Sequence, residues 1–598
     1  MTGQRWCSAI KGRGQMTDRL AALRAEIKAM GVDGVIIPRG DAFSGEEVPA
    51  ADERLAFISG FTGSAGIAIV MADQAVLFSD GRYTIQMETE TGPEWQCLTQ
   101  PEASLSDWLL NHAAGKVIGF DAWLMPVGQR ERLEKAMDGQ VSLTPLDANP
   151  VDRIWPDKPP RPLSRAIPYS IEYAGMTRNE KITACIDRIQ ASHPDVRAMM
   201  ISDPAGLAWL LNARGRDLNH TPVVLAFAVL SRDGTVTILA DPERFADIDA
   251  SGLAFADPAE PGACLSQYGE GEVMIDPSTC PTAIEGMVKG SAIHAESPIT
   301  ALKAIKTGAE LKAFDHAHRI DAVAMVRFLH WLDKTLPERP VREVEVDQKL
   351  IEFRSLSDEF ISPSFATICG GGGNGAIVHY RAVEGKDQPI PMDSLCLIDS
   401  GGQYLGATTD ITRTIAAGTP SAEMIHAFTH VLKAHIALAR CRFPEGTNGI
   451  QLDAITRAPL WQAGLDFAHG TGHGVGCSLS VHEGPASISK RSTRAIEAGM
   501  VLSNEPGFYQ PGGFGIRIEN LIAIQRDDSG MLYAENLTFV PIDRRLIRAD
   551  LLDGDERSWL DAYHRRVRDE IAPLLKARVL SDDDAALSWL IEATEPLA

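Results

Sequence analysis

Residues 396–414 read Cys-Leu-Ile-Asp-Ser-Gly-Gly-Gln-Tyr-Leu-Gly-Ala-Thr-Thr-Asp-Ile-Thr-Arg-Thr. An apolar run ends in Asp399, a Gly-Gly pair follows, and a second acid, Asp410, comes eleven residues after the first. This pattern predicts a hairpin that can place the two carboxylates side by side. Neighbouring carboxylates in water-poor surroundings repel each other, and a bound cation removes that conflict.

Three further candidate ligands follow in glycine-bounded segments. His473 lies in His-Gly-Thr-Gly-His-Gly, Glu505 in Ser-Asn-Glu-Pro-Gly, and Glu519 ends the strand-like alternation Ile-Arg-Ile-Glu. Taken singly, each position also fits a structural role. Asp399 can cap a turn, Asp410 and Glu519 can be exposed strand residues, and His473 can be a structural hydrogen-bonding histidine. All five in this order favour a metal site.

Four carboxylates and one imidazole form a ligand set for two divalent ions. Carboxylate-rich sets suit Mn²⁺, and one imidazole also admits Co²⁺ or Zn²⁺. Two ions about 3.5–4 Å apart can share one water, lower its pKa and direct it at a carbonyl carbon. The sequence therefore predicts metal-assisted chemistry at a carbonyl group.

Three other histidines flank this set: His379, His469 and His482. Imidazole can donate a hydrogen bond to a developing oxyanion or hold a carbonyl group. The glycine-rich run at residues 370–375, just before His379, lacks the Gly-Lys-Ser/Thr of a phosphate-binding P-loop. We interpret this run as a flexible loop that delivers His379.

Composition limits the class of protein. A length of 598 residues predicts roughly three to five domains. The net charge of −23 argues against nucleic acid as a partner, because phosphate backbones require a basic footprint. Nine cysteines without a Cys-x-x-Cys pair indicate neither a disulfide framework nor a zinc ribbon, and free thiols fit a reducing cytosol. No apolar run reaches the roughly 18 residues of a membrane-spanning helix.

The first 15 residues carry Arg5, Lys11 and Arg13 but no acid. They lack the apolar core of a signal peptide. Because Met16 is a plausible domain start, we interpret residues 1–15 as a disordered extension or the result of a misassigned start.

The chain alternates helical and strand patterns over its first 300 residues, which favours α/β domains. A proline-rich stretch, residues 153–168, reads as an extended linker between two such regions. The two regions have similar helix and strand content, although periodicity alone does not show an internal repeat. The expected elements are a helix with Leu20, Leu23, Ile27 and Met30, strands at 35–37, 66–70 and 75–78, a helix at 178–192, a strand at 198–201, an Asp-Gly hairpin over 223–239, a long helix around 324–332, and a helical tail at 587–590.

These motifs resemble the pita-bread metallopeptidase family, and within it the long, three-domain Xaa-Pro aminopeptidases. The resemblance runs from about Met16 to the C-terminus, and the motifs around the five candidate ligands carry it most specifically. Other segments that resemble the family are residues 57–66 (Phe-Ile-Ser-Gly-Phe-Thr-Gly-Ser-Ala-Gly), 80–83 (Asp-Gly-Arg-Tyr), 153–156 (Arg-Ile-Trp-Pro), 306–310 (Lys-Thr-Gly-Ala-Glu) and the tail around 559–564.

The resemblance implies a role for each candidate ligand. Asp399 would bind one metal ion and Asp410 would bridge both. His473 and Glu505 would hold the second ion, and Glu519 would also bridge. Glu505 would in addition carry the proton during catalysis.

The resemblance also implies residues that contact the substrate. His379, His469 and His482 match the family's substrate-side histidines. His379 and His482 are the candidates to stabilise the oxyanion, and His469 and His482 could line the proline pocket. Arg82 matches a position that contacts the peptide from the first domain.

The implied fold is α/β, with α+β character in the catalytic part. Two α/β domains resembling the N-terminal domain of creatinase, at residues 1–160 and 161–302, would precede a pita-bread catalytic domain with a C-terminal tail at 303–598. The resemblance further implies a cytoplasmic homodimer that uses two divalent ions, with Mn²⁺ expected and Zn²⁺ or Co²⁺ as alternatives. Because no apolar run is long enough to span a membrane, we expect no membrane partner.

The expected activity is release of the first residue from peptides with proline at position two. Such bonds need a specialised pocket, because proline lacks an N–H and has a fixed φ. A prolidase acting on Xaa-Pro dipeptides is the alternative within the same chemistry. A metal-free pita-bread protein, either a binding scaffold or an amidinohydrolase such as creatinase, is disfavoured because buried carboxylates without a cation are costly.

Overall fold

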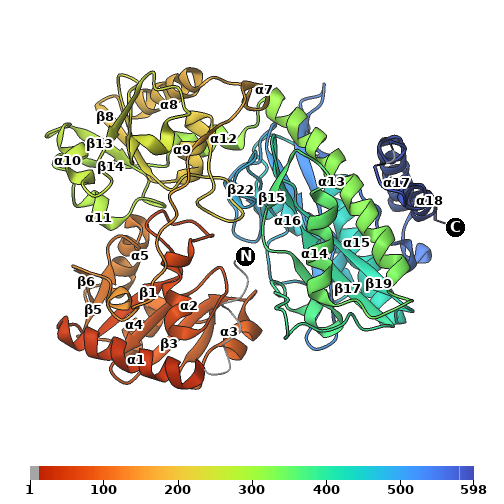
Figure 1. The fold of residues 1–598 in the computed structure, drawn as a ribbon, viewed down its shortest axis with the longest axis horizontal. Helices are drawn as coiled ribbons and strands as arrows, with labels where there is room; N and C mark the ends of the chain where they lie inside the picture. The colour runs from red at the N-terminus through yellow and green to blue at the C-terminus, as the bar shows by residue number, and fades with distance from the viewer. Residues whose placement is uncertain (1–11, 101, 578, 598) are drawn as a thin grey trace. The chain divides into compact units, whose positions relative to one another are not determined.

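The computed structural model describes residues 12–100, 102–577 and 579–597. The predicted N-terminal extension therefore lies mostly outside the described residues. The described chain forms two compact units (Figure 1). Unit 1 comprises Met1–Pro168, Arg178–Leu218 and Val223–Ile299, and unit 2 comprises Tyr169–Thr177, Asn219–Pro222 and Thr300–Ala598.

A six-stranded mixed sheet of order β4-β3-β2-β1-β5-β6 organises the first part of unit 1. The strands are β1 (Gly34–Pro38), β2 (Ile67–Met71), β3 (Ala75–Asp80), β4 (Gln96–Gln100), β5 (Val117–Asp121) and β6 (Ser142–Leu146). The helices are α1 (Gly12–Ala29), η1 (Ala50–Asp52), α2 (Arg54–Ser59), α3 (Thr84–Glu90), α4 (Leu105–His112), α5 (Val127–Met137) and α6 (Pro150–Arg153).

A second six-stranded sheet, of order β12-β11-β10-β8-β13-β14, organises the rest of unit 1. The strands are β8 (Val196–Ile201), β10 (Phe227–Ser231), β11 (Val236–Leu239), β12 (Leu253–Ala256), β13 (Glu272–Ile275) and β14 (Ala292–His294), and the short β7 (Ile167–Pro168) pairs with β9 (Ala213–Arg214). The helices are α8 (Arg178–Ser192), α9 (Pro204–Leu211), η2 (Pro242–Phe245), α10 (Pro261–Ser266) and α11 (Thr282–Glu285).

The two sheets of unit 1 have the same topology. In each, the first strand pairs antiparallel with the second and parallel with the fifth, and the third strand pairs parallel with the fourth. The outermost pairs, β5 with β6 and β13 with β14, are also parallel. The similar content seen in the sequence is therefore a structural repeat.

Unit 2 carries the sheets β16-β17-β19 and β20-β27-β26-β23-β21-β22, with the pairs β15-β18 and β24-β25. The strands are β15 (Phe360–Pro363), β16 (Ile368–Gly371), β17 (Ser394–Ser400), β18 (Gly402–Tyr404), β19 (Ile411–Ala417), β20 (Arg442–Phe443), β21 (Gly472–Gly474), β22 (Glu483–Ile488), β23 (Val501–Asn504), β24 (Gly507–Gln510), β25 (Phe514–Arg517), β26 (Asn520–Arg526) and β27 (Leu532–Asn536). The helices are α7 (Ile171–Ala174), α12 (Pro298–Ala304), α13 (Gly308–Thr335), α14 (Glu343–Arg354), η3 (Gly372–Ala376), α15 (Ala422–Ala439), α16 (Gly449–Gln462), η4 (Arg544–Leu546), η5 (Ala549–Leu551), α17 (Gly554–Leu575) and α18 (Asp583–Ala593).

Helices cover one face of the β16-β17-β19 sheet. The apolar stripe of α13, which includes Phe328 and Leu332, lies in one buried cluster with Val431 of α15, Leu560 of α17 and Ile398 of β17 (Figure 1). Successive strand residues point to opposite faces. The residue after Ile398 therefore faces away from the helices, and that residue is the first candidate ligand.

Most predicted elements are present, and the differences lie at their ends. Helix α1, which carries Leu20, Leu23 and Ile27, begins at Gly12, so residues 12–15 of the predicted extension are helical rather than disordered. The predicted hairpin pairs β10 with β11 but starts at Phe227. Glu519 does not lie on a strand; it occupies the link between β25 and β26. The domain limits 1–160, 161–302 and 303–598 stay a prediction. Among the described residues, no helix is both long and apolar enough to cross a membrane.

The glycine run at 370–375 differs from the flexible loop that we expected. Its first residues belong to strand β16, and the rest form the 3-10 helix η3. The backbone of η3 packs closely on β25, because a Cβ on Gly515 would lie only 1.7 Å from the carbonyl oxygen of Gly375. Close backbone approach therefore accounts for these glycines.

Candidate metal centre

The hairpin that carries the two aspartates forms as the sequence predicts. Strands β17 and β19 pair antiparallel, with Asp399 opposite Thr412, and Asp410 directly precedes β19. The intervening turn is tight, because a Cβ on Gly401 would lie 2.0 Å from the carbonyl oxygen of Thr409. Both carboxylates are buried. Register and close packing together bring the two acids to one end of the hairpin.

The other candidate ligands converge on this hairpin from separate segments: His473 lies on β21, Glu505 in the link between β23 and β24, and Glu519 in the link between β25 and β26. Ligand atoms of Asp410, His473 and Glu519 all lie within 4.8 Å of one another. The Nε2 atom of His473 lies 3.5 Å from Asp410 Oδ2 and 3.4 Å from Glu505 Oε1. The other ring nitrogen, Nδ1, lies 2.9 Å from the carbonyl oxygen of Gly474. That hydrogen bond needs a proton on Nδ1, which leaves Nε2 available as a ligand.

Unpaired carboxylate oxygens show that this cluster suits cations. Asp399 Oδ1, Asp410 Oδ1 and Glu519 Oε1 are buried side-chain atoms without a hydrogen-bond partner. Buried polar groups normally have partners, and an unpaired buried carboxylate is costly. Oxygen-rich sites with one imidazole are a donor set for divalent ions. The residues present therefore fit a metal centre.

Electrostatics supports the same interpretation. Burial raises the pKa of Asp399 to about 7, with repulsion from Asp410 adding to the effect and Arg517 opposing it. Burial also raises the pKa of Glu505 and of Glu519, and the neighbouring carboxylates add to both shifts. These directions describe carboxylates that repel one another, and bound cations would reverse them.

Hydroxyl groups hold two of the carboxylates in place. Thr412 Oγ1 donates to Glu519 Oε2 over 2.7 Å, and Ser503 Oγ donates to Glu505 Oε1 over 3.0 Å. Ser503 Oγ also accepts from the backbone N–H of His473 at 2.9 Å. The hydroxyl contacts to Glu519 and Glu505 each occupy one carboxylate oxygen, fix the orientation of the carboxylate and leave its other oxygen available to a cation.

His469 is joined to the metal cluster by residues that the sequence reasoning missed. His469 Nδ1 and the Gly470 carbonyl are 2.7 Å apart, so Nε2 accepts from Tyr509 Oη, also at 2.7 Å. Arg517 donates to Tyr509 Oη at 2.7 Å and forms an ion pair with Asp399. In the alternation Ile-Arg-Ile-Glu, Arg517 lies two residues before Glu519 and therefore on the same side of an extended chain, a signal that could have identified it. No sequence signal identified Tyr509.

His482 and His379 occupy different positions relative to the cluster. The His482 ring lies edge-on to the His473 ring, with centroids 4.3 Å apart and planes at 84°. His379 lies in the turn after η3, which packs on β25, the strand that leads to Glu519. His482 therefore meets the cluster directly, whereas His379 is brought to its neighbourhood by backbone packing.

Arg82 lies in unit 1, where its guanidinium forms a two-pronged contact with Asp80. Its Nε and Nη2 atoms donate to Asp80 at 2.9 and 2.8 Å, and its guanidinium lies 5.3 Å from the Tyr83 ring centroid. The side chain remains 26% exposed. The role of Arg82 as a contact to the peptide stays a prediction.

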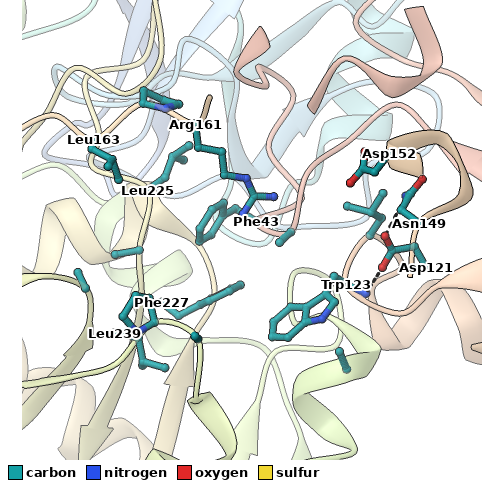
Figure 2. A pocket seen from close by; sticks show the side chains of 18 of the residues that line it. Phe43, Asp121, Trp123, Asn149, Asp152, Arg161, Leu163, Leu225, Phe227 and Leu239 are labelled. Carbon is teal, nitrogen blue, oxygen red and sulfur yellow. Dashed lines mark hydrogen bonds between the residues drawn. The ribbon is translucent and has the colours of Figure 1, made fainter. Parts of the chain in front are cut away.

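Unit 1 also contains a cavity of about 1200 Å³ (Figure 2). Phe43, Trp123 and Phe227 gather at its wall, and Asp121 accepts from the backbone N–H of Trp123 and from the side chain of Asn149, both at 2.9 Å. None of the predicted site residues lines this cavity. We therefore do not assign the chemistry to it.

A second group with metal-ligand side chains, Glu131, Glu285 and His294, lies in unit 1. The two ring nitrogens of His294 face different carboxylates, Nε2 at 2.7 Å from Glu285 and Nδ1 at 3.2 Å from Glu131. Arg130 already forms an ion pair with Glu285 at 2.9 Å. We interpret this partly exposed group as an ion-pair network.

Comparison with known proteins gives matches along nearly the whole chain. Residues 312–526 match metallopeptidase family M24, residues 530–597 match the C-terminal region of peptidase M24, and residues 19–154 and 157–310 each match the creatinase/prolidase N-terminal domain. The chain belongs to metallopeptidase family M24. This confirms the predicted family and the predicted fold.

Relatives of this family member extend over its full length. It is 38% identical to the probable Xaa-Pro aminopeptidase P of Laccaria bicolor, over 97% of this chain and 94% of that protein. It is 37% identical to aminopeptidase P2 of Arabidopsis thaliana, over 95% of this chain and 86% of that protein. The crystal structure of X-prolyl aminopeptidase from Caenorhabditis elegans, described as a cytosolic enzyme with a di-nuclear active site, superposes with a TM-score of 0.91 at 30% identity, over 97% of this chain and 100% of that chain.

Proposed function

We propose that this M24 metallopeptidase is an Xaa-Pro aminopeptidase that removes the first residue from peptides with proline at position two. The convergence of unpaired buried oxygens from Asp399, Asp410 and Glu519 on His473 carries the proposal, because it supplies the donor set that such hydrolysis needs. The full-length similarity to aminopeptidase P proteins supports the substrate class.

Five residues would hold two divalent ions, which we propose to be Mn²⁺. Asp399 would bind one ion, His473 and Glu505 the other, and Asp410 and Glu519 would bridge them. When bound, such a pair acidifies a shared water and polarises the scissile carbonyl. The carboxylate-rich donor set favours Mn²⁺, with Zn²⁺ or Co²⁺ as alternatives.

The side chains around this centre have separate roles in proton transfer, oxyanion stabilisation and substrate binding. Glu505 accepts the proton of the attacking water and passes it to the leaving proline nitrogen. The exposed His482 ring, held against His473, donates a hydrogen bond to the oxyanion, and His379 is the second candidate donor. Tyr509 and Arg517 fix the His469 ring, which lines the proline pocket. Arg82 contacts the peptide beyond the proline.

The prolidase alternative makes a different demand on the protein. A prolidase must recognise the free carboxylate just after proline, for which a fixed cation is required. Arg517 is buried and committed to Asp399 and Tyr509, so it does not offer that cation. The long N-terminal region of this chain, with two creatinase-type domains, also matches the aminopeptidases along their length.

A comparison of substrate lengths tests this assignment. We expect kcat/KM for Ala-Pro-Ala and longer peptides to exceed that for Ala-Pro at least roughly tenfold, because the dipeptide lacks residues for Arg82 to contact. Product release is followed by chromatography in the presence of Mn²⁺. Arg82→Ala should reduce the ratio of kcat/KM for the longer peptides to kcat/KM for Ala-Pro, without loss of metal. The control Arg39→Ala, which removes an ion pair to Glu53 in the same unit, should leave this ratio unchanged. A preference for Ala-Pro would favour prolidase.

We further propose that the protein is a cytoplasmic homodimer. Eight of its cysteines are free thiols, as expected in a reducing compartment. Helix α16 presents Ile450 and Trp461, 38% and 49% exposed, on the same side of the helix and about three turns apart, with the exposed Ala454 between them. An exposed apolar helix face of this kind suits contact with a second copy.

Substitution on this face should dissociate the dimer. Trp461→Asp places a charge where an apolar contact is expected, so sedimentation velocity should show a monomer at concentrations where the unsubstituted protein is a dimer. The matched control, Ile591→Asp, changes a similarly exposed residue (45%) on α18 and should leave the mass unchanged. A dimer that survives Trp461→Asp would place the interface elsewhere.

A further inference from the structure

Three buried charged side chains of unit 2 have no part in the chemistry above: Lys303, Lys306 and Glu483. Lys303 lies on α12, Lys306 follows that helix, and Glu483 is the first residue of β22. The Nζ atom of Lys303 lies 3.1 Å from Glu483 Oε2, and Lys306 contacts Oε1. Lys306 also donates to the carbonyl oxygen of Lys303 at 2.9 Å. A different lysine thus holds each carboxylate oxygen.

This cluster is costly to bury. The three side chains are 6%, 1% and 2% exposed, and two ammonium groups face one carboxylate. Burial raises the pKa of Glu483, but the two ammonium groups outweigh this effect and hold it below its usual value. Apolar replacement of buried ion pairs is often neutral or stabilising. The cluster is therefore better explained by the geometry that it fixes than by stability.

The geometry that it fixes is that of the metal centre. Glu483 directly follows His482, whose ring meets the His473 ring. The backbone of Glu483 pairs with Gly474 at an irregularity in the ladder just after His473. The approach is close, because a Cβ on Gly474 would lie 2.2 Å from the Glu483 carbonyl oxygen. A displacement of Glu483 would thus move the adjacent His482 ring relative to His473.

We propose that Lys303 and Lys306 are positioning residues that, by clamping both oxygens of Glu483, fix the His482 ring against His473. The inference rests on the proposed peptidase function, in which His482 faces the reacting carbonyl. It adds Lys303 and Lys306, which lie more than 170 positions before His482 in the sequence, to the residues that set the geometry of the centre.

A double-mutant cycle tests the clamp. Lys306→Met keeps an apolar chain of similar length and leaves Lys303 and Glu483 as a neutral pair, so the fold should persist. We expect roughly a tenfold fall in kcat, with KM and a metal content of two per chain unchanged, because a correctly oriented hydrogen-bond donor to the oxyanion contributes about 10²-fold or more and a misplaced one contributes less. In a His482→Ala background, the same substitution should change kcat less than about twofold, since the group it positions is gone.

A control and a second readout separate this inference from others. Lys433→Met, which removes an ion pair to Glu556 in the same unit, should have equal effects in both backgrounds. An equal fall in kcat from Lys306→Met with His482 present and in the His482→Ala background would contradict the proposed clamp. A crystal structure of Lys306→Met should show the His482 ring displaced from His473; an unmoved ring would also overturn it, even in an inactive protein. Failure of the unsubstituted protein to cleave Xaa-Pro-Yaa peptides would instead refute the proposed function.

Discussion

Asp410→Ala is expected to lower kcat/KM for an Xaa-Pro-Yaa peptide by about 10³-fold or more, equivalent to at least about 4 kcal/mol of transition-state stabilisation. Asp410 is buried and lies within ligand distance of both His473 and Glu519. Its removal takes away the carboxylate that we propose to bridge the two ions, so we expect loss of one or both ions. Inductively coupled plasma mass spectrometry of the dialysed variant measures that loss directly.

Chelation gives the reversible form of the same test. Treatment with a chelator should abolish cleavage by the unsubstituted protein, and added Mn²⁺ should restore it. Asp583→Asn is the matched control, because it removes a buried carboxylate of unit 2 that pairs with Arg327 and is no part of the metal cluster. This control should lower thermal stability but keep two ions per chain. Full activity in a metal-stripped sample would refute the two-metal proposal.

Metal binding at neutral pH is expected to release more than one proton per chain. Without a cation, burial raises the pKa of Asp399 to about 7, so this group is partly protonated at pH 7. The carboxylates of Asp410 and Glu505 outweigh the effect of burial and raise the pKa of His473 to about 9, so its ring is protonated there. Ligands must lose these protons before they bind a cation. Calorimetric titration with Mn²⁺ in buffers of different ionisation enthalpy measures the number released.

The same pKa values predict how the metal-free protein responds to pH. Asp399 has a folded-state pKa above its unfolded value of about 3.9, so the folded state binds more protons and loses stability as the pH rises from about 4 to 7. His473 also has a raised pKa; its contribution is complete below about 6.5 and is lost as the pH approaches 9. At about 1.4 kcal/mol per pKa unit, Asp399 alone accounts for on the order of 4 kcal/mol.

The control for this prediction lies in unit 1. Burial raises the pKa of Asp41 to about 6, but Asp41 is no part of the metal cluster. Asp41→Asn should alter the pH dependence of stability equally with and without Mn²⁺. Asp399→Asn should instead reduce proton release on Mn²⁺ binding. Proton release that is unchanged in Asp399→Asn, or absent altogether, would contradict the linkage.

The sequence by itself determined the family, the fold class and the set of candidate ligands. Local patterns sufficed for this, because the hairpin with Asp399 and Asp410 needs only an apolar run, a glycine turn and a second strand. The helix at 178–192 and the strand at 198–201 were likewise confirmed as α8 and β8. The roles assigned to the individual site residues stay predictions.

Only the tertiary structure decided which groups surround that ligand set. The partnership of Tyr509 with His469 and Arg517, and the clamp of Lys303 and Lys306 on Glu483, join segments whose spacing in sequence carries no periodic signal. The glycine run at 370–375 was misinterpreted for the same reason: its composition suits a flexible loop, but its conformation is set by the close packing of η3 on β25. Local patterns fix strands and turns, whereas contacts between distant strands depend on how whole sheets pack.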